Sequence, residues 1–343
     1  MKGRIEFIDF ARGYAIFTIV CYHASQRVEL SPLWQKAVVF GGTGVHLFFL
    51  LSGFGLALSG STSRFLTFYR RRLTKVWLPH VMALSISAAA AAGCHLFPDG
   101  FDAWLAGVGL YQMFSEQYIE SFGGHFWFVS AILQFYIVFP GLLWLKNQLG
   151  DRVFLWMALL LSAAWWLLVF FLGKGHLRVW NSFFLQFLWE FALGMVLAGR
   201  YQTSGYFLRP AVQKWWWLSL PAGLFFTGIM IVLVAKWGDA GRIFNDVPAL
   251  AGYTALCFFV YRCAKRFFPP VQRFFLWTGG FSYSLYLIHI LVLEVYLAGM
   301  RSMDIAVNAL NLLPYLLLAL LAARIFEPVS RWWVRFFEQN TPV

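Results

Sequence analysis

Residues 8–24 read IDFARGYAIFTIVCYHA, an apolar run that contains ionisable side chains, among them Arg12 and His23. In a helix, their eleven-residue spacing amounts to roughly three turns plus 20°, which puts both side chains on one face about 16 Å apart. A membrane interior has no water to solvate such groups, so each needs a reason to be there. The pattern predicts a functional site, with a cation below a titratable base. The alternative is structural: Asp9 neutralises Arg12, and His23 lies at the outer interface.

The composition of this 343-residue chain is that of a membrane protein. Hydrophobic residues make up 60% of it and charged residues 12%, and its mean hydropathy is +0.66, whereas about one quarter of a soluble domain is charged. We therefore expect an all-α, polytopic membrane protein with one transmembrane domain, residues 4–328, and a cytoplasmic tail, residues 329–343. Apolar stretches of about twenty residues predict ten transmembrane helices, near residues 7–26, 37–58, 77–97, 126–145, 153–172, 181–199, 215–235, 246–263, 274–297 and 305–326.

The chain is strongly basic, with a net charge of +12, but the distribution of its cations argues against a nucleic-acid ligand. With the N-terminus in the cytoplasm, nineteen Lys and Arg residues fall on the inner side of the ten-helix topology and seven on the outer side. Inner loops of membrane proteins carry this excess. We expect both termini to be cytoplasmic, the basic loop 59–75 inside, the acidic loop 99–120 outside, and no nucleic-acid partner.

Several common site types are missing from the sequence. The cysteines Cys21, Cys94, Cys257 and Cys263 have no metal-type spacing, and there is no GxGxxG, P-loop or HExxH motif. The basic N-terminus is not followed by a small-residue cleavage site, which argues against a signal peptide. We expect no metal site and no bound cofactor.

Residues 41–55, GGTGVHLFFLLSGFG, open and interrupt the second expected span with glycines. Small residues allow helix backbones to approach closely in a membrane, so this stretch predicts tight helix packing. His46, within it, is expected to be an interface residue rather than a ligand.

The segment 68–79, FYRRRLTKVWLP, places four cations at the mouth of the third expected helix. Arg72 and Lys75 are three residues apart and therefore neighbours on a helix surface, where together they can clamp a phosphate-bearing ligand from the cytosol. Orientation of the protein and binding of lipid phosphates are the alternative explanations.

Five further polar or aromatic residues lie near the expected outer face or at membrane depth. His125 and Trp127 begin the fourth expected span, either as interface anchors or as part of an outer mouth. Glu190, Glu294 and His289 fall at membrane depth, where carboxylates usually face a bundle interior or a cavity. For these three, a structural hydrogen bond and a catalytic role are equally compatible with the sequence.

Taken in order, these motifs resemble the membrane-bound acyltransferase family 3, over roughly residues 4–328. The motifs that carry the resemblance are Arg4, Asp9, Arg12 and His23, GVxLFFxLSGF over 44–54, the basic segment ending in Leu78 and Pro79, FWF at 126–128, Tyr136 with Pro140, and SYSLYLIH at 282–289. Each motif is weak alone, but the order and spacing are specific.

The resemblance implies transfer of an acyl group, most often acetyl, from cytosolic acyl-CoA to a hydroxyl. The family's arginine and histidine correspond to Arg12 and His23, and its paired arginines to Arg72 and Lys75, where lysine lacks the planar fork of arginine. His23 is the expected catalytic residue, either as general base or as carrier of the acyl group. Asp9 is placed in the catalytic set with it, or else pairs with a neighbouring arginine. Arg12, Arg72 and Lys75 are expected to hold acyl-CoA.

These features together predict a transmembrane O-acyltransferase of the bacterial inner membrane, a stand-alone version without the C-terminal hydrolase-like domain of many relatives. Acyl-CoA is its donor substrate, and its other partners are a glycan or lipid-linked sugar acceptor, membrane lipids and, as an open question, a second copy of the chain. The rivals are an exporter of a polysaccharide or lipid-linked sugar, and a structural partner of a glycan synthase. The candidates on the acceptor side are His125, Trp127, Glu190 and His289.

Overall fold

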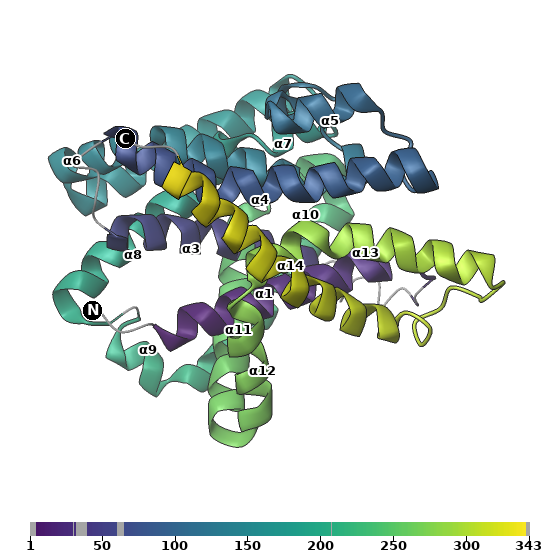
Figure 1. The fold of residues 1–343 in the computed structure, drawn as a ribbon. Coiled ribbons are helices and arrows are strands. Elements are labelled where there is room, and N and C mark those ends of the chain that lie inside the picture. Colours follow the sequence, from purple (N-terminus) through teal and green to yellow (C-terminus); the bar gives the residue numbers. More distant parts are fainter. Residues whose placement is uncertain (1–4, 30, 32–39, 60–64, 207, 341–343) are drawn as a thin grey trace.

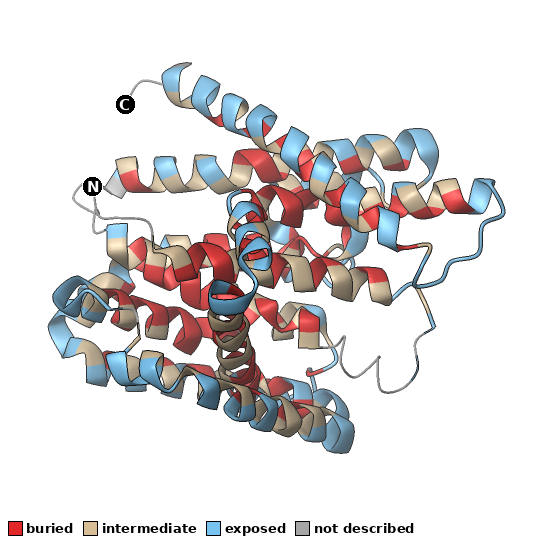
Figure 2. Cartoon of the chain, turned by 90° about the horizontal axis from the view of Figure 1, so that it is seen from below, coloured by how far each residue is buried: buried red, intermediate tan, exposed pale blue. Residues whose placement is uncertain are grey.

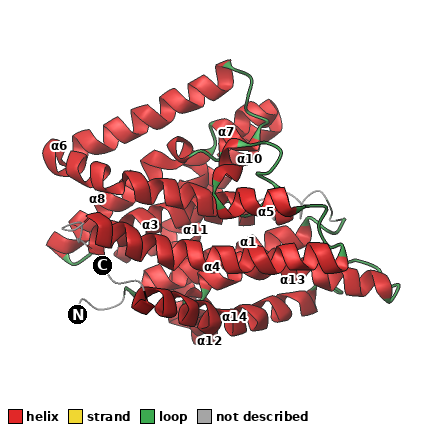
Figure 3. Ribbon diagram, turned by 45° about the horizontal axis from the view of Figure 1, so that its top comes forward, coloured by secondary structure: helices red, strands yellow, loops and turns green. Residues whose placement is uncertain are grey.

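The computed structural model describes residues 5–29, 31, 40–59, 65–206 and 208–340, which form a bundle of helices with no strand among them (Figures 1 and 3). The expected all-α fold is confirmed for this part of the chain. The α-helices are α1 (Glu6–Ser25), α3 (Gly44–Ser59), α4 (Phe65–Cys94), α5 (Phe101–Val108), α6 (Trp127–Phe171), α7 (Arg178–Asn181), α8 (Leu188–Ser204), α9 (Pro210–Lys214), α10 (Ser219–Ile243), α11 (Asp246–Phe267), α12 (Pro269–Gly279), α13 (Ser282–Ser302) and α14 (Leu313–Asn340). Short 3-10 helices η1 (Tyr111–Phe114), η2 (Ser121–Gly123), η3 (Phe184–Phe187) and η4 (Trp216–Leu218) lie between them.

The surface of the bundle is apolar, as expected for a protein that contacts lipid. Large hydrophobic side chains such as Phe171, Ile325 and Phe225 are 78%, 69% and 64% exposed, and an exposed apolar surface of this kind marks a membrane contact in a natural protein. Eight helical segments of the described residues are long and apolar enough to cross a membrane. The protein is therefore a multi-pass membrane protein.

The expected total of ten spans remains a prediction, and two helices bear on it. Helix α1 is not among the eight segments, and three of its twenty residues, Glu6, Asp9 and Arg12, are charged. Helix α6 has 45 residues, with Gly150 at φ 75° and ψ 163° inside it. A straight helix of that length would be about 68 Å long, more than twice the roughly 30 Å of a membrane's hydrocarbon core. The break at Gly150 lies between the fifth and fourth expected spans.

The last two expected spans are wrong in their boundaries. The ninth, near 274–297, contains a break, because α12 ends at Gly279 and α13 begins at Ser282. The tenth begins at Leu313, not near 305, and Asn308 forms a side-chain turn before it by accepting a hydrogen bond from the Asn311 N–H. Hydropathy does not register such breaks in apolar sequence. Helix α14 continues past residue 328 to Asn340, so the expected tail is helical in its described part.

Glycines bring two pairs of helices into backbone contact. A Cβ atom on Gly53 of α3 would lie 2.1 Å from the Phe191 carbonyl oxygen of α8, and one on Gly194 of α8 would lie 2.0 Å from the Leu50 carbonyl oxygen of α3. Only glycine permits backbones to approach this closely. The predicted tight packing of the second span is confirmed.

Close backbone contact at glycines also holds helix α1 in the middle of the bundle. A Cβ atom on Gly13 would lie 1.9 Å from the Phe275 carbonyl oxygen of α12, and one on Gly279 would lie 2.0 Å from the Asp9 carbonyl oxygen of α1. The side chains of Phe10 and Ile16 are completely buried, and buried residues gather where the helices cross (Figure 2). The position of α1 is therefore fixed along its length.

Candidate functional site

Two cavities meet at the side chains of Phe128 in α6 and Tyr286 in α13, which line both of them. The first, of about 390 Å³, is lined by His23 and is called the His23 cavity. The second, of about 320 Å³, is lined by Arg12 and is called the Arg12 cavity. Both volumes are within the range of ligand sites, about 300–1,000 Å³.

Helix α1 supplies a residue to each cavity. It is continuous from Glu6 to Ser25, as expected, so Arg12 and His23 are separated by about 16 Å along one rigid element. Since Arg12 lines one cavity and His23 the other, α1 fixes the distance between a permanent cation and a titratable ring.

The Arg12 cavity is polar on several walls. Arg12 is half-buried, and its Nη2 lies 3.6 Å from the point where a Cβ atom on Gly55 of α3 would be. Other walls come from Tyr136 of α6, from Ser282 at the start of α13 and from Glu327 of α14. The cavity thus combines a guanidinium, a carboxylate and hydroxyl groups.

Glu327 was not foreseen from the sequence. Its carboxylate accepts hydrogen bonds from the Ser284 hydroxyl and from Arg331 Nε, which ties α13 to α14 at the wall of the Arg12 cavity. The available signal was a carboxylate at the end of the last apolar run, four residues before an arginine.

Arg72 and Lys75 lie on α4 in different environments. Arg72 is half-buried, donates a hydrogen bond from Nη2 to the Ser59 hydroxyl at 2.8 Å, and lies within electrostatic range of Tyr136, as does Arg12. Lys75 is exposed and does not line the Arg12 cavity. The structure therefore links Arg72, and not Lys75, to the neighbourhood of Arg12.

Asp9 does not join His23. Fourteen residues of continuous helix separate the two, which corresponds to about 21 Å. Asp9 is buried, lines neither cavity and lies where α1 packs against α12. Its expected place in a catalytic set with His23 is not supported by this geometry.

His23 lies beside two buried histidines. Its ring centroid is 5.2 Å from that of His289 in α13, which is 5.1 Å from that of His125. His23 is half-buried, and its Nδ1 lies 3.2 Å from Gln26 Oε1. When that oxygen accepts from Nδ1–H, the lone pair on His23 Nε2 remains available as a base.

The backbone fixes the tautomers of the other two rings. His289 Nδ1 lies 2.7 Å from the Tyr286 carbonyl oxygen, and His125 Nε2 lies 3.2 Å from the Leu287 carbonyl oxygen. A carbonyl oxygen can only accept, so these nitrogens carry the protons in the neutral rings. His289 Nε2 and His125 Nδ1 are buried and make no hydrogen bond within the described residues. The ring nitrogens left over are therefore proton acceptors close to His23.

Trp127 and His125 both line the His23 cavity, as one of their two expected roles requires. The guanidinium carbon of Arg178 lies 5.4 Å from the Trp127 ring centroid, within the range of a cation–π interaction. The phenolic hydroxyl of Tyr286 donates a hydrogen bond to the His125 carbonyl oxygen. An aromatic surface, a cation and a fixed tyrosine thus surround the site.

Glu294 has a structural position. Its carboxylate forms an ion pair with Arg27, which follows the C-terminal end of α1, and so ties α1 to α13. Of the two roles that the sequence left open for this residue, the structural hydrogen bond is the one that the contacts support.

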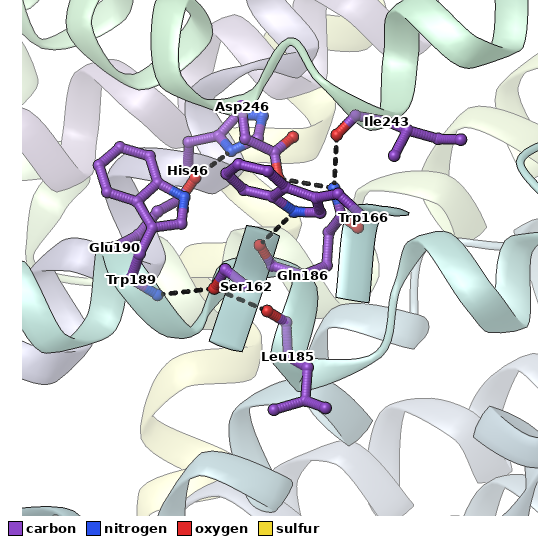
Figure 4. Close-up of polar contacts among 9 residues, drawn as sticks. All are labelled: His46, Ser162, Trp166, Leu185, Gln186, Trp189, Glu190, Ile243 and Asp246. Carbon is purple, nitrogen blue, oxygen red and sulfur yellow. Dashed lines mark hydrogen bonds and ion pairs between the residues drawn. The ribbon is translucent and has the colours of Figure 1, made fainter. Parts of the chain in front are cut away.

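His46 is not an interface residue, contrary to expectation. It is 7% exposed, and its Nδ1 lies 2.7 Å from Oε1 of Glu190, which is completely buried (Figure 4). Asp246, at the start of α11, completes a group in which one donor atom from each residue lies within 4.8 Å of the other two. The expectation failed because Glu190 and Asp246 are distant from His46 in the sequence and meet it only through packing.

Comparison with known proteins identifies the family. No curated protein and no solved structure matches the chain. Residues 5–337 match the acyltransferase 3 family, described as an acyltransferase domain, and this match covers nearly the whole chain. Arg12, His23 and the other residues that line both cavities all lie within it. The chain therefore belongs to the acyltransferase 3 family of membrane acyltransferases.

Proposed function

We propose that the protein transfers an acyl group, with acetyl as the first candidate, from cytosolic acyl-CoA to a hydroxyl of an envelope glycan or lipid-linked sugar. One observation carries this proposal: two cavities meet at Phe128 and Tyr286, one lined by Arg12 and the other by His23. A donor that carries phosphates needs a cation, and a hydroxyl acceptor needs a base. The two cavities offer these groups on opposite sides of a shared wall.

On the donor side, Arg72 and Lys75 are the proposed partners of the CoA phosphates. Arg72 is half-buried near Tyr136, a residue of the Arg12 cavity, whereas Lys75 is exposed. Arg72 is therefore assigned the larger contribution, with Lys75 as an outer contact that lipid phosphates also attract. Arg12 lies further along the same proposed path, where it can attract the anionic donor or polarise the thioester.

On the acceptor side, His23 is the proposed general base. The acceptor oxygen attacks the thioester carbonyl carbon, a C–O bond forms, and the hydroxyl proton passes to His23 Nε2. The C–S bond then breaks, and the leaving thiolate takes the proton to give free CoA. A route in which His23 carries the acyl group gives the same products, and an acyl-histidine trapped by acid quenching would distinguish it.

The main rival function is export of a polysaccharide or a lipid-linked sugar. A conduction path for such a molecule requires a continuous passage, whereas the structure has two separate cavities that share Phe128 and Tyr286 in their walls. This division favours transfer of a small group across a wall. We place the protein in the bacterial inner membrane with both termini in the cytoplasm, so that the Arg12 cavity faces the donor.

The test uses purified full-length protein in lipid nanodiscs with radiolabelled acetyl-CoA. We expect release of free thiol and appearance of label in an ester of an added envelope polysaccharide fraction. Arg12→Gln should slow both together. If no acyl-CoA tested releases thiol while labelled polysaccharide crosses a proteoliposome membrane, the exporter is the correct function.

A further inference from the structure

We propose that His46, Glu190 and Asp246 bind one divalent transition-metal ion, with Zn²⁺ as the expected ion. The three residues come from α3, α8 and α11, and one donor atom of each lies within 4.8 Å of the other two. All three are buried, at 7%, 0% and 3% exposure. Binding of a metal ion at this cluster is independent of the proposed acyl transfer.

The charge of the cluster calls for a cation. Two carboxylates lie together inside a membrane protein, where an unneutralised charge is very costly. Among the described residues, no Lys or Arg forms an ion pair with Glu190 or Asp246, and His46 is the partner of Glu190. A divalent ion bound by two carboxylates and a neutral imidazole makes the group neutral. Shared protons are the competing way to neutralise it.

Some nitrogen and oxygen atoms of the cluster that could bind a metal ion make no hydrogen bond. Glu190 Oε2 is buried and has no partner within the described residues. His46 Nε2 and Asp246 Oδ1 also form no hydrogen bond within the described residues, but they belong to residues that line the His23 cavity and are not among the buried unpartnered atoms. Buried polar atoms in proteins are rarely left without a partner. A metal ion would provide one.

Gln186 supports the site as an outer residue. Its Nε2 donates hydrogen bonds to Asp246 Oδ2 at 2.8 Å and to the Ile243 carbonyl oxygen at 3.1 Å (Figure 4). Such a bond fixes the orientation of a ligating carboxylate, and removing one commonly weakens metal binding about 10–100-fold. The side chain thus holds Asp246 in place toward His46 and Glu190.

The donor set and the surroundings indicate the kind of metal. One imidazole nitrogen with two carboxylate oxygens is a donor set that Zn²⁺ accepts, whereas Ca²⁺ and Mg²⁺ are bound by oxygen alone. Three protein ligands leave a fourth position open, as in many sites where zinc also holds water. His46 and Asp246 line the His23 cavity, which gives an ion a path into the cluster.

The experiment measures metal binding by the full-length protein, purified in detergent with a histidine-free tag and stripped with a chelator. Titration with Zn²⁺ should show one tightly bound ion per chain and a raised thermal unfolding midpoint, with weaker effects of Ca²⁺ and Mg²⁺. His46→Gln, Glu190→Gln and Asp246→Asn should abolish this binding. Gln186→Leu, which keeps all three ligands, should weaken it about 10–100-fold.

The matched control is His125→Gln, because His125 is another buried histidine of the same cavity and lies outside the cluster. It should bind Zn²⁺ like the wild type. The proposal is overturned if well-folded wild-type protein binds no Zn²⁺, which would indicate shared protons, or if the three ligand variants bind as tightly as the wild type. Should a ligand variant fail to elute as a single species, the wild type and Gln186→Leu still decide the question.

Discussion

The Arg12 cavity and the His23 cavity share the wall made by Phe128 and Tyr286 but differ in the chemistry of their other walls. The first contains a permanent cation and Glu327, whose carboxylate is held by two hydrogen-bond donors. The second also contains permanent cations, Arg178 and Arg242, but it differs from the first in its histidines, of which it has four: His23, His46, His125 and His176. A fixed charge suits binding of an anion, and titratable rings suit movement of a proton. Because histidines line only the second of these two cavities, we propose that proton transfer takes place there and that the donor binds in the first.

The two cavities are coupled because α1 contributes to both. Its backbone is in contact with α12 at Gly13 and Gly279, so it cannot shift without moving that helix. If α1 stays in place, we expect a change to one of its residues to affect the cavity that this residue lines and not the other. If α1 moves, both cavities should be affected. The predictions below separate local effects from movement of α1.

The largest effect is expected for His23→Ala. Loss of a general base typically lowers a rate about 10²–10⁴-fold. Transfer of label from acetyl-CoA should fall by that amount, while protein yield and CoA affinity stay at wild-type levels. His289→Ala serves as the comparison and should have a smaller effect, since its Nδ1 bonds only to backbone carbonyls. Near wild-type transfer by well-folded His23→Ala would remove this residue from the mechanism.

The next effect is expected for Arg72→Ala on the donor side. A hydrogen bond to a charged group contributes about 1.5–3 kcal/mol, so the KM for acyl-CoA should rise roughly 10- to 100-fold while the KM for the acceptor changes little. Steady-state kinetics with each substrate varied in turn would measure this. Arg71→Ala, an exposed neighbour on the same helix, is the matched control. Equal increases in both KM values would point to lipid contact or misfolding.

A third, moderate effect concerns the packing that holds α1. Gly13→Ala places a methyl group where only 1.9 Å separates it from the Phe275 carbonyl oxygen, and overpacking of this kind costs about 1–3 kcal/mol. The thermal unfolding midpoint should fall, and both acyl-CoA binding and acyl transfer should weaken. In Gly141→Ala the new methyl group meets no atom within 4 Å, so its midpoint should be unchanged or slightly raised. A Gly13→Ala protein as stable as wild type would show that α1 is free to move.

The smallest effect is expected at the shared wall. Tyr286→Phe keeps the ring between the cavities but removes the hydroxyl that donates to the His125 carbonyl oxygen. A neutral hydrogen bond contributes about 0.5–1.5 kcal/mol, so transfer should fall by no more than about tenfold. Kinetics of this variant beside Tyr286→Ala, which opens the wall to water, would show whether the ring or the hydroxyl is important. Equal losses in both would assign the role to the hydroxyl.

Much of the fold and part of the site followed from the sequence because their signals are local. Apolar stretches gave the helical membrane bundle, the glycines of 41–55 gave close packing, and a spacing of eleven residues put Arg12 and His23 on one continuous helix. Each of these inferences needs only the period of a helix and the chemistry of neighbouring residues.

The rest depended on contacts between distant segments. His46 and Glu190 are 144 residues apart and Gln186 and Asp246 are 60 apart, so no spacing rule connects them. The break between α12 and α13 lies in apolar sequence whose hydropathy continues across it, whereas the break at Gly150 falls in the polar stretch 146–152 between two expected spans. Asp9 was placed in a catalytic set with His23 on the family resemblance, but the rise of the helix puts about 21 Å between them.

The most direct test of the division between the cavities compares Arg12→Gln with His23→Gln in matched nanodisc preparations. Affinity for CoA, measured by calorimetry, and thiol release from acetyl-CoA in the presence of acceptor are determined for both variants. We predict that Arg12→Gln binds CoA roughly tenfold or more weakly, as expected for a lost charge-assisted contact, and that His23→Gln binds CoA normally but releases almost no thiol. If both variants lose CoA affinity equally, or if Arg12→Gln binds CoA like the wild type, the assignment of donor binding to the Arg12 cavity and of proton transfer to the His23 cavity is wrong.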